Sequence, residues 1–199
     1  MKNISVLIAA ALCAGCACFT QGGNNMDAQE RKGLVTMAGA PLSLLGPDVN
    51  VGDTAPDFRA VDAGFKPVKL ADFKGRACLI SAVPSLDTGV CAAQTKRFND
   101  EVKNLPPGIA VITISMDLPF AQKRFCDSEK VDRVLVLSDH VWREFGLGYG
   151  VLIKDMGLLA RSIFVVGKDG RVAYKEIVPE LTQHPDYNAA LAAARKAAK

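Results

Sequence analysis

The chain has 199 residues, of which 49% are hydrophobic and 23% are charged, and its formal net charge is +3 at pH 7. This is the composition of a globular protein of about one domain, with enough apolar side chains to form a core. Its 24 basic and 21 acidic residues are well mixed. Because no block of Lys and Arg is present, the sequence gives no support for nucleic-acid binding.

Residues 1–18 have the features of a targeting segment. Lys2 gives a positive start, and the apolar run at 4–12 is too short for a stable transmembrane helix. The following Ala-Gly-Cys resembles the end of a bacterial lipobox, with Cys16 at the lipidated position. We therefore predict a periplasmic or membrane-anchored lipoprotein, attached to the membrane only through that lipid. A simply cleaved signal is the alternative, and if the segment is not a working signal the protein is cytoplasmic.

The remaining chain divides into a tether and one domain. Residues 19–33 are largely polar and include Gly22-Gly23-Asn24-Asn25, which predicts a flexible tether. We expect the domain to span 34–199. In chain order we expect a hairpin at 34–45, a strand at 58–62, a helical turn at 70–75, a strand at 77–83, a helix at 89–103, a strand at 109–115, a helix at 120–126, a strand at 134–137, a helix at 139–145, strands at 162–166 and 172–177, and a helix at 186–199.

Alternating strands and helices, followed by a hairpin and a last helix, predict an α/β fold with a mixed sheet flanked by helices. This is the element order of a thioredoxin-like fold, here with an N-terminal hairpin. The turn Lys168-Asp169-Gly170 between the last two strands is a strong hairpin signal.

Three cysteines lie in the predicted domain: Cys78, Cys91 and Cys126. Cys78 falls within an apolar strand, so we expect it in the core. Cys13 and Cys16 match C-x-x-C in spacing, but they follow an apolar run instead of a strand, so we do not interpret them as a thioredoxin-type site. Three scattered Cys and two His residues do not form a zinc pattern, and no metal site is predicted.

Cys91 follows the loop 84–88, which connects a predicted buried strand to a predicted helix. Free backbone N–H groups and the helix dipole stabilise a thiolate at such a position, and the thiolate is the nucleophilic form of cysteine. Thr88 is one turn earlier, so its hydroxyl could bond both the sulfur and a substrate oxygen. Pro84 stiffens the loop and shields the sulfur. On position alone, an inert buried cysteine is an equal alternative.

The pattern Pro84-x-x-x-Thr88-x-x-Cys91 resembles the active-site loop of peroxiredoxins. The whole segment PSLDTGVCAA resembles one subgroup closely, the bacterial thiol peroxidases, which are atypical two-cysteine peroxiredoxins. Further segments that match this subgroup follow in the same order, at 120–126, 148–151, 159–162 and 185–191. The resemblance covers the chain from about residue 35 to its end, and a match of this length and order is not expected by chance.

The resemblance implies a role for each matching residue. Cys91 is the peroxidatic cysteine, which attacks a peroxide and becomes a sulfenic acid. Thr88 hydrogen-bonds the thiolate and the peroxide, and Pro84 shapes the pocket. Arg161 supplies the cation that favours the thiolate and stabilises the leaving oxygen. Without the resemblance, Arg161 is interpreted as a surface arginine at the start of a strand.

Cys126 is the resolving cysteine by the same resemblance, and it would attack the sulfenic acid to give an intramolecular Cys91–Cys126 disulfide. A disulfide requires the two Cα atoms within about 7 Å. We therefore predict that one or both predicted helices partly unwind during the cycle. A buried helix cysteine without a redox role is the alternative.

The implied function is a thiol-specific peroxidase that reduces hydrogen peroxide and alkyl or lipid hydroperoxides. We expect no bound cofactor, because the sulfur carries the redox chemistry. Leu86, Phe120 and Leu147 are candidates for an apolar wall beside Cys91 that favours organic hydroperoxides. The subgroup also suggests a homodimer and a thioredoxin-type reductant. Outside the inner membrane this reductant has to be a periplasmic or membrane-linked thioredoxin-like protein.

Two other classes of function remain open. A dithiol oxidoreductase shares the fold class, although the predicted helix opens with Thr-x-x-Cys instead of Cys-x-x-Cys. A non-enzymatic lipoprotein could use the same fold as a binding module, and Cys91→Ser would then leave its role intact. Consumption of peroxide by the purified protein separates both from a peroxidase.

Overall fold

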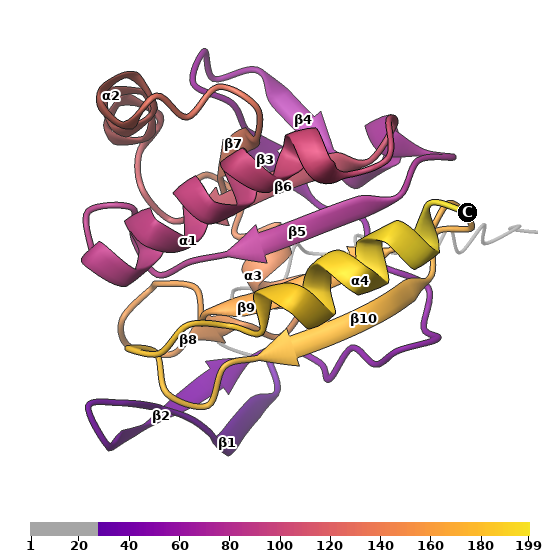
Figure 1. Ribbon diagram of the computed structural model, residues 1–199. Coiled ribbons are helices and arrows are strands. Elements are labelled where there is room, and N and C mark those ends of the chain that lie inside the picture. The colour runs from indigo at the N-terminus through magenta and orange to yellow at the C-terminus, as the bar shows by residue number, and fades with distance from the viewer. Residues whose placement is uncertain (1–27) are drawn as a thin grey trace, which may run out of the picture.

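The computed structural model describes residues 28–199, and these form an α/β fold around a seven-stranded mixed sheet (Figure 1). The strand order is β10-β9-β5-β6-β7-β3-β4. The strands of this sheet are β3 (Arg59–Val61), β4 (Pro67–Lys69), β5 (Cys78–Ala82), β6 (Ala110–Ser115), β7 (Leu135–Ser138), β9 (Ser162–Val166) and β10 (Val172–Ile177). A second, three-stranded sheet contains β1 (Glu30–Met37), β2 (Ala40–Leu45) and β8 (Leu152–Ile153).

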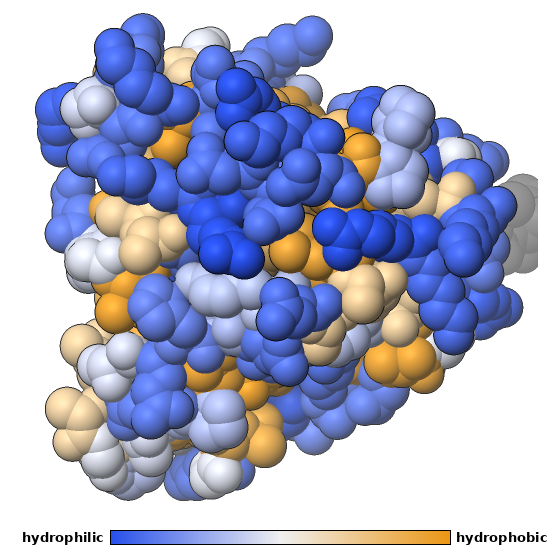
Figure 2. Space-filling model, viewed as in Figure 1, coloured by the Kyte–Doolittle hydropathy of each residue, from blue (hydrophilic) through white to orange (hydrophobic). Residues whose placement is uncertain are grey.

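Helices cover both faces of the large sheet. The helices are α1 (Gly89–Glu101), α2 (Pro119–Glu129), α3 (Glu144–Gly148) and α4 (Tyr187–Ala197), with short 3-10 helices η2 (Leu70–Phe73) and η3 (Val102–Asn104). In Figure 1, α1 and α4 lie side by side in front of the sheet, and α3 lies behind it. Polar residues cover most of the front face, where apolar side chains show only as small separate patches (Figure 2). No helix among the described residues has the length and apolar character needed to cross a membrane.

The alternation of side chains along the central strands creates two cores. On β5, Cys78 and Ile80 pack into the core on the α3 side, which also holds Phe58 and Phe145. Leu79 points the other way, into the core under α1 and α4. Because both faces of β5 are covered, all five of its residues are buried and its sequence is a continuous apolar run without alternation. The predicted fold class and most of the predicted elements are confirmed.

The N-terminal hairpin is confirmed, but it begins earlier than predicted. β1 starts at Glu30, so residues 30–33 belong to the sheet and not to a tether. Their polar composition resembles that of a linker, but two of these side chains form ion pairs within the fold: Arg31 with Asp48 at 2.6 Å, and Glu30 with Lys154 at 2.6 Å. The rest of the predicted tether and the targeting segment with Cys16 lie outside the described residues.

The helix predicted at 139–145 is wrong in its position. The helix α3 begins at Glu144 and continues through Gly146, one residue beyond the predicted end. The buried Asp139 carboxylate accepts hydrogen bonds from the N–H groups of Phe145 (3.1 Å) and Gly146 (2.8 Å), so this residue holds the start of α3 instead of belonging to it. Burial raises the pKa of Asp139 to about 7. A Cβ at position 146 would lie 2.7 Å from Leu159 Cδ2 and 3.2 Å from Leu152 Cβ, so a larger residue there would force these side chains to shift.

Candidate functional site

The loop 84–88 joins the centre of the large sheet to α1. After β5 the N–H of Val83 makes a last bond to the carbonyl of Ile114, and Pro84 has no N–H to continue the pairing. Thr88 has extended backbone angles (φ −108°, ψ 145°) and forms the N-cap of α1. Cys91 is therefore the third residue of the helix, in the first turn, where backbone N–H groups have no partner within the helix. The predicted placement of Cys91 at a helix start is confirmed.

Cys91 and Arg161 meet in the interior of the protein. The guanidinium nitrogen Nη2 of Arg161 lies 3.4 Å from the Cys91 sulfur. The two side chains are 0% and 2% exposed, so water screens this contact very little. The two residues are seventy positions apart in the sequence. They come together because β5 and β9 are antiparallel neighbours, so the C-terminal end of β5, which leads to α1, lies beside the N-terminal end of β9, which follows Arg161. A fixed cation beside a thiol favours the thiolate.

Two further groups, which the sequence did not reveal, hold Arg161 in place. The carbonyl of Leu181 accepts from Nε at 3.0 Å and from Nη2 at 2.8 Å, and Gln94 Oε1 accepts from Nη1 at 2.7 Å. The amide of Gln94 donates to Ser81 Oγ at 2.8 Å, which fixes its orientation. Gln94 is three residues after Cys91 and therefore lies on the same face of α1. That spacing could have suggested it, whereas the sequence carries no signal for a carbonyl ligand at residue 181.

Thr88 and Pro84 lie at the site, but Thr88 does not make the bond to the sulfur that was expected. Within residues 28–199, no hydrogen bond joins its hydroxyl to Cys91. Thr88 Oγ1 donates instead to the carbonyl of Ser85 at 3.1 Å. Pro84 is buried and Thr88 is exposed, and both line the same pocket as Arg161.

The pocket beside Cys91 has an apolar mouth, but not the one expected. Its apolar lining includes Met37 from the hairpin, together with Met156 and Leu158 from the segment after β8. Of the residues predicted as a wall, Phe120 is 70% exposed on α2. Leu147 packs against the core on the other side of the sheet, and Leu86 is buried at a neighbouring groove between the loop and α2. The prediction of this wall is therefore wrong for Phe120 and Leu147, whereas Leu86 lies in the same buried core as Cys91.

Cys126 lies on α2 and is half-buried, with its side chain against the core that contains Cys91. Both thiols are free. Burial, followed by the charge of Asp127, raises the pKa of the Cys126 thiol. Cys126 is therefore a weaker acid than an exposed thiol in this conformation, and its reactivity as a thiolate rises when α2 opens to water.

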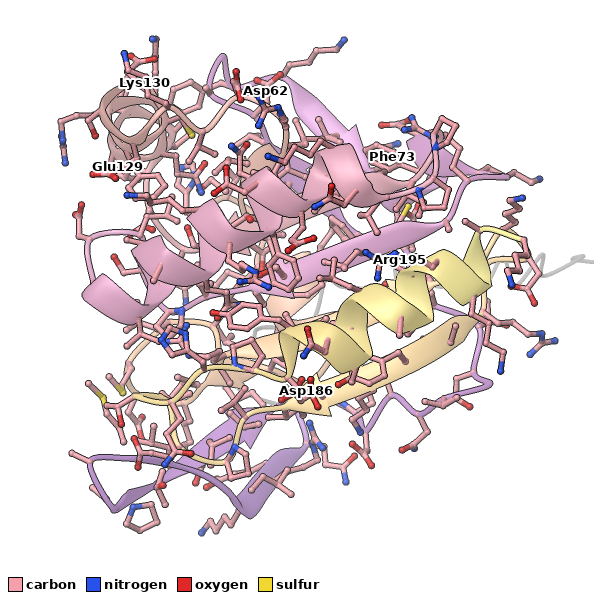
Figure 3. All side chains as sticks on the ribbon, in the orientation of Figure 1. Asp62, Phe73, Glu129, Lys130, Asp186 and Arg195 are labelled. Atoms are coloured by element: carbon pink, nitrogen blue, oxygen red, sulfur yellow. The ribbon has the colours of Figure 1, made fainter. Side chains whose placement is uncertain are left out.

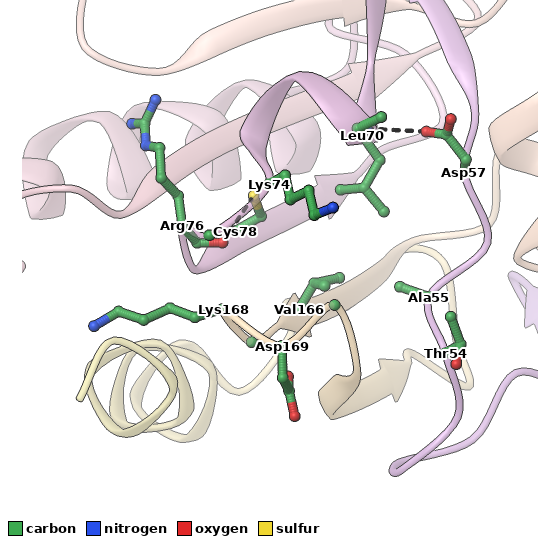
Figure 4. Close-up of a pocket in the computed structure, with 14 residues that line it drawn as sticks. Thr54, Ala55, Asp57, Leu70, Lys74, Arg76, Cys78, Val166, Lys168 and Asp169 are labelled. Atoms are coloured by element: carbon green, nitrogen blue, oxygen red, sulfur yellow. Dashed lines mark hydrogen bonds between the residues drawn. The ribbon is translucent and has the colours of Figure 1, made fainter.

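Cys78 lies at the opposite end of β5 from the site. Its side chain is 1% exposed, and burial raises its pKa to about 11, so it is a protonated thiol in the core, as predicted. A second pocket lies over it, with Lys74, Arg76 and Lys168 among its lining residues (Figure 4). This pocket is separate from Cys91, since the chain enters β5 there and leaves it at the loop 84–88.

Comparison with known proteins gives the family. The model of the redoxin family matches residues 50–191. A thiol peroxidase of Halalkalibacterium halodurans is 50% identical over 163 residues, which are 82% of this chain and 98% of the relative. A thiol peroxidase of Staphylococcus aureus is 52% identical over 159 residues, or 80% and 96% of the two chains. The Bacillus subtilis thiol peroxidase is 48% identical over 165 residues, or 83% and 98%.

Solved structures give the same fold. A peroxiredoxin-like protein from Aquifex aeolicus superposes with a TM-score of 0.77 at 40% identity, covering 83% of this chain and 98% of its own. A thiol peroxidase from Chromobacterium violaceum superposes with a TM-score of 0.71 over 78% and 91% of the two chains. Its 23% identity shows the fold alone.

Proposed function

The chain belongs to the thiol peroxidases within the redoxin family, and on that premise we propose that it reduces peroxides with Cys91 as the nucleophile. The observation that carries the proposal is the buried contact of 3.4 Å between Arg161 and the Cys91 sulfur, at the first turn of α1 and beside an open pocket. The guanidinium and the N-terminus of α1 both place positive charge beside the sulfur, where an attacking thiolate carries its negative charge.

The chemistry follows from these positions. The Cys91 thiolate attacks one peroxide oxygen, and a sulfur–oxygen bond forms as the oxygen–oxygen bond breaks. The sulfur is oxidised to sulfenic acid, and the leaving oxygen takes a proton and departs as water or an alcohol. Negative charge moves from sulfur to oxygen during this step, and Arg161, held by Gln94 and the Leu181 carbonyl, stays within reach of both atoms.

The pocket supports organic hydroperoxides as substrates in addition to hydrogen peroxide. Met37 and Met156 are 44% and 40% exposed at its mouth, where an alkyl chain can bury apolar surface. The polar oxygen atoms of the substrate would then meet Arg161 at the inner end. We propose alkyl or lipid hydroperoxides as the substrate class on this basis.

Cys126 completes the proposed cycle. It attacks the Cys91 sulfur, the sulfur–oxygen bond breaks, and hydroxide leaves and is protonated to water. The resulting Cys91–Cys126 disulfide is reduced by a thioredoxin-type protein through thiol–disulfide exchange. The half-buried position of Cys126 on a complete helical turn supports a local opening of α2 before this step.

The assembly and location of the protein are proposed on separate grounds. An exposed apolar patch of Phe65, Leu118 and Phe120, with the first and last rings 5.2 Å apart, supports a homodimer. The lipobox-like sequence supports export and lipidation at Cys16. We expect Cys16→Ala in the full chain to move the protein from the membrane fraction of a bacterial host to a soluble fraction. An unchanged distribution would contradict the lipid anchor.

The central test of the function is a peroxidase assay on matched variants in which one cysteine is replaced by serine. Cys91→Ser is expected to reduce peroxide consumption to the uncatalysed level, because serine has no sulfur that peroxide can oxidise to a sulfenic acid. Cys78→Ser is the matched control, since Cys78 is a core thiol outside the site, and it should retain activity. Activity in Cys91→Ser, with thioredoxin and its reductase as the electron source, would contradict the proposal and favour another nucleophile.

A further inference from the structure

The loop before Cys91 is tied to the residue pair Ser115, the last residue of β6, and Asp117, which lies between β6 and α2. Asp117 Oδ1 accepts from Ser85 Oγ at 2.7 Å, and Asp117 Oδ2 accepts from the N–H of Leu86 at 2.8 Å. Asp117 lies outside β6 and α2 and its side chain does not cap α2, and its carboxylate is bonded to a loop 31 and 32 positions earlier in the chain.

Further hydrogen bonds connect the same carboxylate to α2. Ser115 Oγ donates to Asp117 Oδ2 at 2.8 Å and accepts from Gln122 Nε2 at 3.0 Å. Gln122 is 1% exposed and also donates to the carbonyl of Leu137 at 2.8 Å. A continuous chain of hydrogen bonds therefore runs from the Cys91 loop through Asp117 and Ser115 to the helix that carries Cys126.

A second set of contacts joins α2 and the segment after it to α1 without involving that loop. Lys96 and Glu129 form an ion pair at 2.6 Å, and Figure 3 shows Glu129 on the side of α2 nearest α1. Asn99 Oδ1 accepts from the N–H groups of residues 132, 133 and 134. These contacts lie beyond the first turn of α1, so they can persist while the loop and the start of α2 separate.

We propose that Asp117 is a positioning residue that fastens the Cys91 loop to α2 and sets how fast Cys126 can reach the oxidised sulfur. The proposal rests on the proposed function. With Asp117 in place, the loop keeps Cys91 in the pocket for attack on peroxide. Formation of the disulfide requires both segments to leave these positions, and each hydrogen bond to the carboxylate opposes that movement.

The consequence is a choice between two fates for the sulfenic acid. Resolution by Cys126 releases the hydroxyl oxygen and gives the disulfide. A second peroxide instead adds an oxygen to the sulfenic acid, giving sulfinic acid and releasing water or an alcohol. Slow opening at Asp117 lengthens the life of the sulfenic acid and so raises the sulfinic acid yield at high peroxide.

The test measures two rate constants by rapid quench and mass spectrometry in single turnovers of the full-length protein. Asp117→Ala removes the acceptor for Ser85, Leu86 and Ser115, and we expect disulfide formation to accelerate about tenfold while peroxide attack does not accelerate. Asp117→Asn keeps the size and one acceptor oxygen, so about a threefold increase is expected. The sulfinic acid yield should fall in the same order. Ser85→Ala, a milder change at the loop, serves if Asp117→Ala does not fold.

Lys96→Met is the matched control, because it also loosens α2 from α1 but at an exposed pair away from the loop. Its two rate constants should match those of the original protein. The proposal is overturned if disulfide formation in Asp117→Ala and Ser85→Ala stays within twofold of the original rate, or if Lys96→Met accelerates it equally. Absence of any disulfide in the original protein would instead contradict the proposed function.

Discussion

Replacing Arg161 with methionine is expected to slow the reaction of Cys91 with peroxide by about 100- to 1,000-fold, the range for loss of one preorganised charge-stabilising donor. The loss has two sources. The Cys91 thiolate loses its only hydrogen-bonded cation among the described residues, and the leaving oxygen loses the group that stabilises its developing charge. Stopped-flow measurement of single-turnover oxidation at pH 7, under excess peroxide, gives the rate constant directly.

The matched control for this prediction is Arg171→Met. Arg171 is an exposed arginine in the turn before β10, where its guanidinium donates to the carbonyl of Gly52. Its replacement should leave the rate constant unchanged. Arg161→Lys should fall between, because lysine keeps the charge but cannot contact Gln94, Leu181 and the sulfur in the same fork. A rate in Arg161→Met within threefold of the original would contradict the role assigned to this residue.

Replacing Cys126 with serine is expected to leave the first step intact and to stop the cycle after it. One equivalent of peroxide per chain is consumed in a burst, and steady-state turnover with a thioredoxin-type reductant then falls to a few per cent or less, because thiol–disulfide exchange has no disulfide to act on. The trapped Cys91 sulfenic acid is detected by labelling with a dimedone reagent and mass spectrometry.

Two features of the structure sharpen this prediction. Cys126 is half-buried and free, so serine fits its place without disturbing the core. Cys78→Ser changes a thiol that is more deeply buried, and it should retain full turnover. Steady turnover in Cys126→Ser at the original rate would show that a different thiol, or the reductant itself, resolves the sulfenic acid.

The sequence predicts an element correctly where its local pattern of apolar and turn residues matches the burial of that element in the folded protein. The buried strands at the sheet centre are continuous apolar runs, and the last hairpin carries a turn signal, so both were predicted correctly. The errors have tertiary causes. β1 starts in polar residues that form ion pairs with distant parts of the chain, and a Cβ on Gly146 in α3 would press on Leu159 and Leu152. β8 has two residues and pairs with β2, far away in the sequence, so no local period marks it.

The residues proposed to react could be named from the sequence, but the groups that hold them in place could not. Cys91, Cys126 and Arg161 were named from the resemblance to a family, and the structure places Cys91 and Arg161 in contact. The contact of Arg161 with the Leu181 carbonyl uses the backbone and leaves no trace in residue type. The apolar mouth depends on how the hairpin folds over the pocket, which places Met37 where Phe120 was expected.

Peptide mapping of the full-length protein after one equivalent of peroxide, with free thiols alkylated before digestion, is the decisive experiment for the proposed cycle. We expect one new species, a peptide pair linked by a Cys91–Cys126 disulfide, with Cys78 fully alkylated. The linked pair should revert to two alkylated peptides after treatment with thioredoxin and its reductase. Complete consumption of the peroxide with Cys91 still alkylated, or a link that involves Cys78, would rule out the proposed cycle.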